Sequence, residues 1–214
     1  MMMTMKTIKI IDYLEELYPE ASCELNYKTD YELLIAVMLS AQTTDVSVNK
    51  VTATLFNKYP TLEKLSRANV EEVMDIIRPI GTYRKKSQNI IDISKSLLKN
   101  YNGVVPNDRN YLESLPGVGR KTANVVLSIL YNEPVCAVDT HVKRVAIRLG
   151  LAKDTDDVLT IEKKLTKIFP KEKLNKIHHQ LIFFGRYHCK ARNPNCENCK
   201  LKDVCKYIKN KKLQ

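Results

Sequence analysis

The chain has 214 residues, with 35 Lys and Arg against 24 Asp and Glu, so its formal net charge is +11 and its isoelectric point is near 9.3. No apolar run reaches the ~18 residues of a membrane-spanning helix, and residues 1–11 lack the apolar core and cleavage site of a secretory signal, so we expect a cytoplasmic, nucleoid-associated location. The length is enough for one or two domains with hydrophobic cores, and the positive charge favours a polyanionic partner such as nucleic acid.

Apolar residues at helical spacing predict a succession of helices along the chain. Thr29 and Glu32 form a capping box at the start of one helix, with Thr29 as N-cap and Glu32 reaching back. Asn107 or Asp108 is expected to cap a later helix that runs to Leu115. The remaining apolar stripes lie within 33–41, 48–56, 70–77, 90–98, 123–127, 158–168 and 174–182. Because no segment alternates convincingly between apolar and polar residues, the sequence predicts an all-α fold.

The segment Leu115–Ala123 has the pattern of a helix end, a tight hairpin and a new helix. Pro116 ends the first helix, and Gly117 and Gly119 allow backbone angles that side chains forbid. A turn without side chains lets a phosphate approach its N–H groups, and the next helix directs its positive N-terminal end at that phosphate. Lys121 falls in the first turn of this helix, where a positive charge is unfavourable, which indicates a chemical task such as that of a reactive amine.

Four of the six cysteines lie close together near the C-terminal end, with the spacing C-x6-C-x2-C-x5-C: Cys189, Cys196, Cys199 and Cys205. In an intracellular protein this cluster favours a metal site over disulfides, and the spacing fits both zinc and an iron–sulfur cluster. Cys23 and Cys136 are isolated and are expected to be small buried residues. Lys190 and Arg192 lie between the first two clustered cysteines, where they either face DNA or solvate the loop.

The hairpin at Leu115–Ala123, the acid within Val138–His141 and the cysteine spacing together resemble the endonuclease III family of bacterial DNA glycosylases and abasic-site lyases. The resemblance extends over nearly the whole chain. Further segments that look like this family are Glu24–Asn26, Glu32–Val37, Leu39–Gln42, Thr44–Lys50 and His178–His179.

The resemblance implies a two-lobed helix–hairpin–helix glycosylase fold. One domain, residues 23–133, would be a helical barrel containing the hairpin, and the other, residues 1–22 plus 134–214, would carry a [4Fe–4S] cluster on the four clustered cysteines. The expected substrate is double-stranded DNA containing damaged bases, above all oxidised pyrimidines, or abasic sites. The protein would act as a monomer and bind DNA across the cleft between the lobes.

The resemblance also implies roles for single residues. Lys121 matches the family's nucleophile and Asp139 its catalytic carboxylate, while Gln42 matches the residue that fills the space left by a flipped nucleotide. A loop that wedges the duplex matches Ile80 and the Gly81–Thr82 turn, in which Thr82 replaces the bulky aliphatic residue common in the family, so Ile80 is expected to carry more of the wedge. The complete set expected to bind DNA is Gln42, Ile80, Gly81, Thr82, Gly117, Val118, Gly119, Arg120, Lys190 and Arg192.

The chemistry of these residues fits the implied reaction. A damaged base must leave the stack before it can be reached. A neutral lysine amine can then attack C1′, displace the base and form a Schiff base, after which elimination breaks the 3′ phosphate bond. The helix N-terminus, Arg120 and partial desolvation are expected to favour the neutral amine of Lys121. Asp139 would stabilise positive charge on the sugar and help to move the lysine proton, whereas His141 is expected to make a structural hydrogen bond.

Three alternatives remain at this point. An adenine-mismatch glycosylase shares the hairpin, acid and cluster, but typically lacks the lysine and continues well past the cluster, whereas this chain ends nine residues after Cys205. A pyrimidine-dimer glycosylase of the same superfamily fits the motifs as well. A non-catalytic DNA-binding module would use the hairpin alone, but it needs neither Lys121 nor Asp139.

Overall fold

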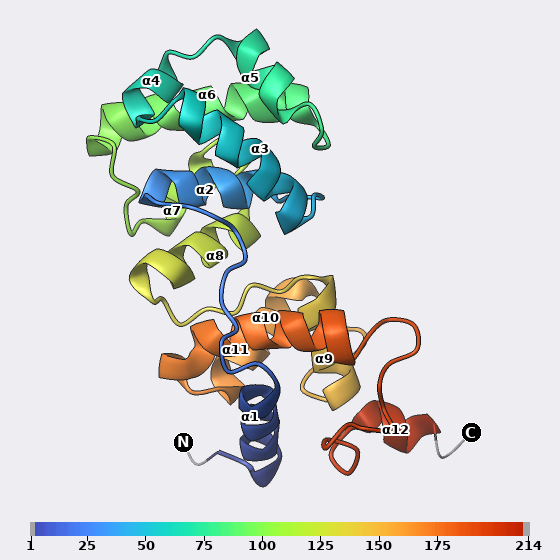
Figure 1. Cartoon of the computed structure of the whole chain (residues 1–214). Helices are drawn as coiled ribbons and strands as arrows, with labels where there is room; N and C mark the ends of the chain where they lie inside the picture. The colour runs from blue at the N-terminus through green and yellow to red at the C-terminus, as the bar shows by residue number, and fades with distance from the viewer. Residues whose placement is uncertain (1–2, 212–214) are drawn as a thin grey trace. The chain divides into compact units, whose positions relative to one another are not determined.

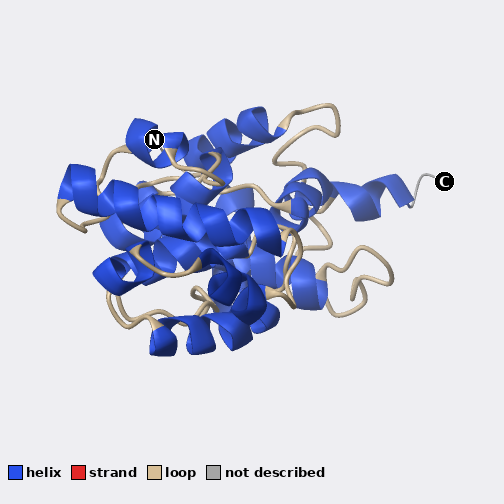
Figure 2. Cartoon of the chain, turned by 90° about the horizontal axis from the view of Figure 1, so that it is seen from above, coloured by secondary structure: helices blue, strands red, loops and turns tan. Residues whose placement is uncertain are grey.

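The computed structural model describes residues 3–211, and all regular secondary structure in this range is helical (Figure 2). The prediction of an all-α fold is therefore confirmed. The chain divides into two compact units: the central unit, Glu24–Tyr131, and the terminal unit, Met1–Cys23 with Asn132–Gln214. The domain boundaries expected from the sequence lie between residues 22 and 23 and between residues 133 and 134. Residues 1–2 and 212–214 of the expected second domain lie outside the described residues.

The central unit is built from seven α-helices (Figure 1). They are α2 (Asp30–Leu39), α3 (Asp45–Lys58), α4 (Leu62–Ser66), α5 (Val70–Ile77), α6 (Tyr83–Tyr101), α7 (Arg109–Ser114) and α8 (Arg120–Tyr131). The short helices α4 and α5 pack along α6, while α2 contacts α3, α6 and α8. Because nearly every residue of α2 is buried, this helix forms the middle of the unit and fixes its neighbours around it.

Side-chain caps explain where several of these helices begin. Thr29 accepts a hydrogen bond from the Glu32 N–H at 3.4 Å, and the Glu32 carboxylate reaches back to the Lys28 N–H at 2.6 Å, one residue earlier than in the standard capping box. Asp108 caps α7 by accepting from the Tyr111 N–H at 3.1 Å. The capping signals in the sequence therefore locate these helix starts correctly.

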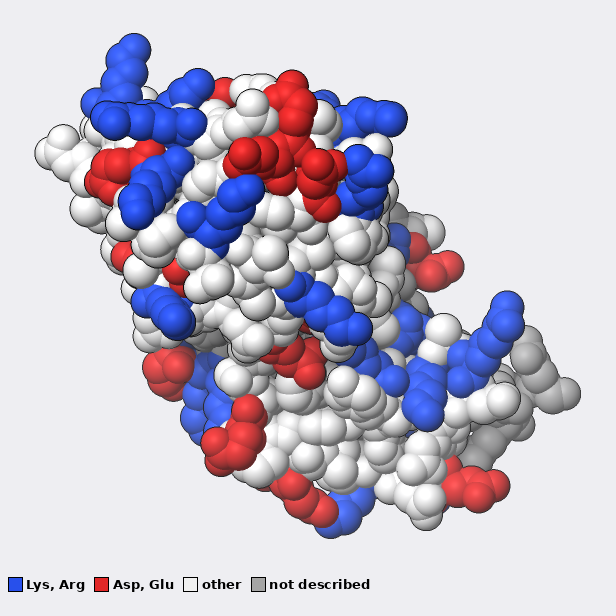
Figure 3. Space-filling model, turned by 45° about the horizontal axis from the view of Figure 1, so that its top comes forward, with Lys and Arg blue, Asp and Glu red and all other residues white. Residues whose placement is uncertain are grey.

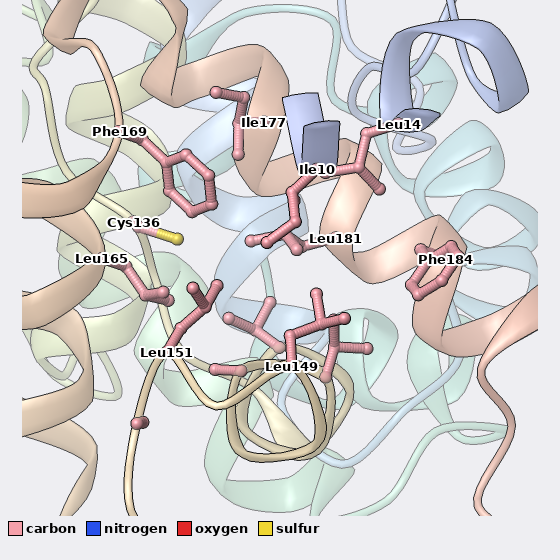
Figure 4. Packing of buried hydrophobic residues seen from close by; sticks show 14 of the residues in the cluster. Ile10, Leu14, Cys136, Leu149, Leu151, Leu165, Phe169, Ile177, Leu181 and Phe184 are labelled. Atoms are coloured by element: carbon pink, nitrogen blue, oxygen red, sulfur yellow. The ribbon is translucent and has the colours of Figure 1, made fainter. Parts of the chain in front are cut away.

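The terminal unit combines the first helix of the chain with its last third. Its helices are α1 (Met5–Leu17), α9 (Thr140–Leu149), α10 (Val158–Ile168), α11 (Leu174–Phe183) and α12 (Lys206–Lys211), with a 3-10 turn at Lys171–Lys173 and a π-helical turn at Phe184–His188. Helix α1 packs against α11, and α9 contacts α10, α11, α12 and the π-helical turn. Figure 4 shows the apolar side chains of these elements converging on one core, which includes Leu14, Leu149 and Phe184.

Cys136 lies in this core, and its thiol is fully buried (Figure 4). Burial raises the pKa of the Cys136 thiol, which keeps it neutral and supports its prediction as a small apolar residue. Cys23 is only half-buried. Within residues 3–211 no helix is both long and apolar enough to cross a membrane.

Charged side chains of both signs are interspersed on the face of the molecule drawn in Figure 3, with a group of acidic residues toward its top. On this face the excess of Lys and Arg is not gathered into one patch.

Candidate functional site

The hairpin between α7 and α8 has the predicted form, but its two glycines differ. Gly117 has a φ of +79°, and a Cβ there would lie 2.4 Å from Nδ2 of Asn89 and 3.3 Å from Cγ of Met38. Gly119 is outside the left-handed region, and a Cβ there would meet nothing within 4 Å. Both glycines allow backbone angles that side chains forbid, but only Gly117 adopts one, so within this hairpin the fold itself requires a glycine only at Gly117.

The backbone of the hairpin leaves room for an anion at the start of α8. The N–H groups in the first turn of a helix have no partner within that helix, and Arg120 and Lys121 are the first two residues of α8. The Val118 side chain is buried, and its N–H donates to the Leu115 carbonyl at 3.1 Å. The Val118 side chain and N–H are therefore engaged within the protein, and the exposed Gly119 and Arg120 are the better candidates for phosphate binding.

Substitutions at the two glycines should separate folding from binding. Gly117→Ala is expected to lower the free energy of unfolding by about 2 kcal/mol or more, because it combines a strained φ with a clash against Asn89. Gly119→Ala is expected to leave thermal unfolding unchanged while weakening DNA binding, because its methyl group projects where a phosphate would lie. Thermal unfolding and fluorescence-anisotropy titration with a DNA duplex measure the two effects. Equal DNA affinity of Gly119→Ala and the wild type would contradict the assignment.

Lys121 is exposed in the first turn of α8. The residues around Lys121 therefore do not provide the partial desolvation of its amine that is expected from the sequence. Its position beside Arg120 in the first turn of α8 is as expected. The arrangement places a primary amine directly after the open backbone turn at Gly119.

Gln42 is exposed in the turn between α2 and α3, with a φ of +58°. This left-handed conformation is uncommon for a glutamine. The turn also contains Ser40, whose hydroxyl donates to the Val37 carbonyl at 2.8 Å, and Thr44, which caps α3. The side chain of Gln42 is therefore presented to solvent by a turn that is tied to the helices on both sides.

The loop from Ile80 to Thr82 connects α5 to α6. Gly81 and Thr82 are exposed, and Thr82 has a φ of +55°, which is a strained value for a β-branched residue. Ile80, in contrast, is 2% exposed and its N–H donates to the Ile77 carbonyl at 3.0 Å. The expectation that Ile80 carries more of the wedge disagrees with this burial, because its side chain anchors the loop in the core and leaves the tip to Gly81 and Thr82.

Asp139 is half-buried at the N-terminus of α9 in the terminal unit. Its Oδ1 accepts a hydrogen bond from the Val142 N–H at 2.7 Å, so it is the N-cap of that helix. His141 accepts through Nδ1 from Arg144 at 3.2 Å, and Arg144 also donates to the Gly185 carbonyl at 2.7 Å. His141 thus makes the structural hydrogen bond expected of it, whereas Asp139 has a capping role that the sequence analysis did not predict.

Residues 189–205 contain no helix and hold the four clustered cysteines. The π-helical turn leads into this loop, and the Cys189 N–H donates to the Phe184 carbonyl at 2.6 Å. The thiols are free, and besides burial, the closeness of the other three cysteines raises the pKa of the Cys199 thiol. Burial raises the pKa values of Cys189 and Cys199, so a bound metal is needed to keep these sulfurs as thiolates.

Arg148 on α9 organises this loop, and the sequence analysis missed it. Its guanidinium donates to the carbonyls of Cys189, Lys190 and Ala191 at 3.3, 2.6 and 3.1 Å, and to Sγ of Cys189 at 3.4 Å. It also stacks over the ring of Tyr207, with 4.5 Å to the centroid. A cation that donates to a cysteine sulfur stabilises the thiolate form that metal binding requires. Lys190 and Arg192 themselves are exposed on the loop.

The donor set fits a cluster of several irons. Within the described residues, no three His, Cys, Asp or Glu side chains gather closely enough to hold one metal ion. In a [4Fe–4S] cluster each thiolate binds a different iron, so its four sulfurs need not converge on one point. Four free cysteines on a loop without regular structure, with an arginine beside one sulfur, have the composition that such a cluster requires.

Comparison with known proteins agrees with this geometry. The model of the HhH-GPD superfamily of base excision DNA repair proteins matches residues 35–171, and that of the iron–sulfur binding domain of endonuclease III matches residues 189–205. Endonuclease III of Bacillus subtilis (strain 168) is 48% identical over 206 residues, which cover 96% of this chain and 94% of that protein. The chain belongs to the endonuclease III family.

Other members of the endonuclease III family are equally similar. The protein of that name from Escherichia coli (strain K12) is 48% identical over 202 residues, covering 94% of this chain and 95% of its own. A solved structure of a trapped covalent endonuclease III–DNA intermediate, an estranged-adenine complex, matches with a TM-score of 0.90 and 50% identity, covering 99% of this chain and all of that one. Membership of the endonuclease III family makes this chain a DNA-binding base excision repair enzyme, a DNA glycosylase and abasic-site lyase with a [4Fe–4S] cofactor.

Loss of one cluster cysteine should disrupt the loop. We expect the purified protein to be yellow-brown with about four irons and four sulfides per chain, and Cys199→Ser to lose most of this iron together with solubility and DNA affinity, because the loop has no regular structure of its own. Cys23→Ser, outside the loop, is the matched control and should keep its iron. Iron and sulfide analysis with DNA titration provides the measurement. A Cys199→Ser protein with full iron content would contradict this assignment.

Proposed function

We propose that this enzyme removes oxidised pyrimidine bases from double-stranded DNA and then cleaves the strand at the resulting abasic site, with Lys121 as the nucleophile. The observation that carries the proposal is the position of Lys121, exposed in the first turn of α8 directly after a turn with open space at Gly119. A phosphate held at the hairpin would bring the adjacent sugar within reach of the lysine amine.

In the proposed reaction, Lys121 is the only protein residue that forms a covalent bond to the DNA. Its neutral amine attacks C1′ of the flipped nucleotide, the C1′–N bond to the base breaks, and the base leaves with the bonding electron pair and takes up a proton. The amine loses its proton and the sugar ring opens to give a Schiff base. Loss of a C2′ proton then expels the 3′ phosphate by β-elimination, and water releases the enzyme. The family's trapped covalent DNA intermediate supports this route.

Asp139 is proposed as the carboxylate that assists this attack. One of its oxygens is committed to the Val142 N–H, which fixes the orientation of the carboxylate and leaves the other oxygen for the reaction. A carboxylate held in this way can stabilise positive charge on the sugar and accept the proton from the lysine. The residue therefore combines a structural cap with an electrostatic task.

The remaining site residues are proposed to bind the phosphates of the duplex and to contact its strands around the flipped nucleotide. Gly117, Gly119 and Arg120 would hold a phosphate near the reacting sugar, with Lys190 and Arg192 adding charge-assisted phosphate contacts from the cluster loop. Gln42 would fill the space left by the flipped nucleotide, and Gly81 with Thr82 would press on the opposite strand. We propose that the enzyme works as a monomer in the cytoplasm, on the nucleoid, as expected for a repair enzyme whose named relatives are bacterial.

Borohydride trapping tests the proposal, because it reduces a Schiff base to a stable protein–DNA adduct. Four duplexes should be compared, carrying thymine glycol, an abasic site, an A·G mismatch or a pyrimidine dimer. The expected result is an adduct with the first two duplexes and none with the last two. Adduct formation restricted to the pyrimidine dimer, or no adduct with any duplex, would overturn the proposed substrate or the proposed lysine chemistry.

A further inference from the structure

Two turns of the central unit hold ordinary side chains in a left-handed conformation. Five non-glycine residues of the described chain have a positive φ, and three of them are asparagines, which tolerate it well: Asn102, Asn132 and Asn193. The other two are Gln42 and Thr82. Strain of this kind persists only where the surrounding structure enforces it, and it gathers at functional positions. The structure therefore has to supply something that holds both turns.

Lys86, on the first turns of α6, supplies this restraint. It is a lysine with only 5% of its surface exposed. Its Nζ donates to the carbonyls of Leu39 and Ala41 at 2.9 and 2.8 Å and to the hydroxyl of Thr43 at 3.3 Å. An ammonium group has three donors, so all of them are used on the segment that brackets Gln42.

The same residue also fixes the second turn. The Lys86 N–H donates to the Thr82 carbonyl at 3.0 Å, which is the first helical hydrogen bond after the strained residue. Thr82 makes no capping bond with its side chain, since its hydroxyl donates to the Gly81 carbonyl at 2.7 Å. Lys86 is thus bonded through its backbone to one strained turn and through its side chain to the other.

No carboxylate compensates for this buried charge. Within the described residues Lys86 has no ion pair, and its ammonium is stabilised by carbonyl groups at the C-terminal end of α2, where the helix dipole favours a cation. Burial lowers the pKa of Lys86, so its burial carries a free-energy cost. The packing of α2 against α6 does not by itself call for a charged side chain here, whereas the carbonyls of Leu39 and Ala41 do need the donor that Lys86 supplies.

We propose that Lys86 is a positioning residue that couples the Gln42 turn to the Thr82 turn, so that both are presented to a damaged duplex in one fixed arrangement. The inference rests on the proposed functions of Gln42 and Thr82 as the residues that probe the duplex. Lys86 itself, buried beneath the turns, does not touch DNA. Replacing Lys86 should therefore slow cleavage only of substrates that have an opposite strand for Gln42 and Thr82 to contact.

The test compares two abasic-site substrates, a duplex and a single strand of the same sequence. On the duplex, single-turnover cleavage by Lys86→Met is expected to be at least about tenfold slower than by the wild type, because Gln42 and Thr82 would no longer be held in the productive position. On the single strand, the two rates should agree within about twofold. Lys95→Met, an exposed lysine on the same helix, is the matched control and should change neither rate by more than about twofold.

A double-mutant cycle distinguishes the positioning role from a merely structural one. If Lys86 acts through the Gln42 turn, Lys86→Met should slow a Gln42→Ala enzyme no further on the duplex. Thr43→Val removes one acceptor at the surface of the turn without touching the core, and should show the same duplex-only loss at smaller size even if Lys86→Met does not fold. Borohydride adducts of the wild type with both substrates establish the proposed lysine chemistry separately.

Equal losses of Lys86→Met on duplex and single strand, additive losses in the double mutant, or an unchanged duplex rate in Thr43→Val would each overturn the positioning role. None of these results would affect the proposed function as long as the wild type forms the adduct. If the wild type formed no adduct with either substrate, the proposed function would fail instead.

Discussion

Lys121→Ala is expected to abolish both base release and strand cleavage while leaving DNA binding within about threefold of the wild type. The phosphate contacts are proposed to come from the backbone of the hairpin, which the substitution leaves in place, whereas attack at C1′ requires the amine. Because the side chain is exposed, stability should change by less than about 0.5 kcal/mol. Single-turnover assays, borohydride trapping and DNA titration on one preparation measure all three properties.

Lys121→Arg is the charge-matched partner of this variant. It keeps a cation at the start of α8 but offers no neutral amine, because a guanidinium stays protonated at any working pH. It should bind DNA as the wild type does and form no trapped adduct. Other lysines such as Lys85 should not substitute in either variant, so an adduct that persists in purified Lys121→Ala would assign the nucleophile elsewhere.

The sequence predicts the helical class and most helix positions, because both rest on local patterns. The capping box at Thr29 and the cap at Asp108 are local hydrogen bonds, and apolar spacing of three and four residues reports directly on a buried helix face. Helix α9 was missed although its apolar residues have that spacing. In the sequence, Val138–His141 indicates only a motif that carries an acid, whereas the structure shows that Asp139 is also a helix N-cap.

The errors at the site have a different origin. A glycine pair in sequence does not reveal which glycine needs a positive φ, since that depends on the close approach of Asn89 to Gly117 from another helix. Ile80 was expected in the wedge because of the family resemblance and because Thr82 is a poor wedge, but its burial is decided by the packing of the α5–α6 loop. Lys86 and Arg148 were missed for the same reason, because a lysine or arginine that bonds carbonyls far away in the chain looks like any other surface charge.

The capping role of Asp139 allows its charge to be tested apart from its structural bond. Asparagine is as good an N-cap as aspartate, so Asp139→Asn should keep the hydrogen bond from the Val142 N–H and change stability by less than about 0.5 kcal/mol. Asp139→Ala loses the cap and should be destabilised by about 1 kcal/mol. Urea unfolding distinguishes the two variants before any activity is measured.

Both variants are expected to lose about two orders of magnitude or more in single-turnover rate, because each removes the carboxylate proposed to stabilise charge on the sugar and to take the lysine proton. Asp157→Asn is the matched control, since Asp157 caps α10 in the same unit through the same bond, accepting from the Thr160 N–H at 2.7 Å. It removes the same charge from the same kind of cap and should leave the rate unchanged. If Asp139→Asn kept the wild-type rate while Asp139→Ala lost both stability and rate, the capping bond alone would explain why α9 begins with an aspartate, and the acid–base step at Lys121 would have to be assigned to another group.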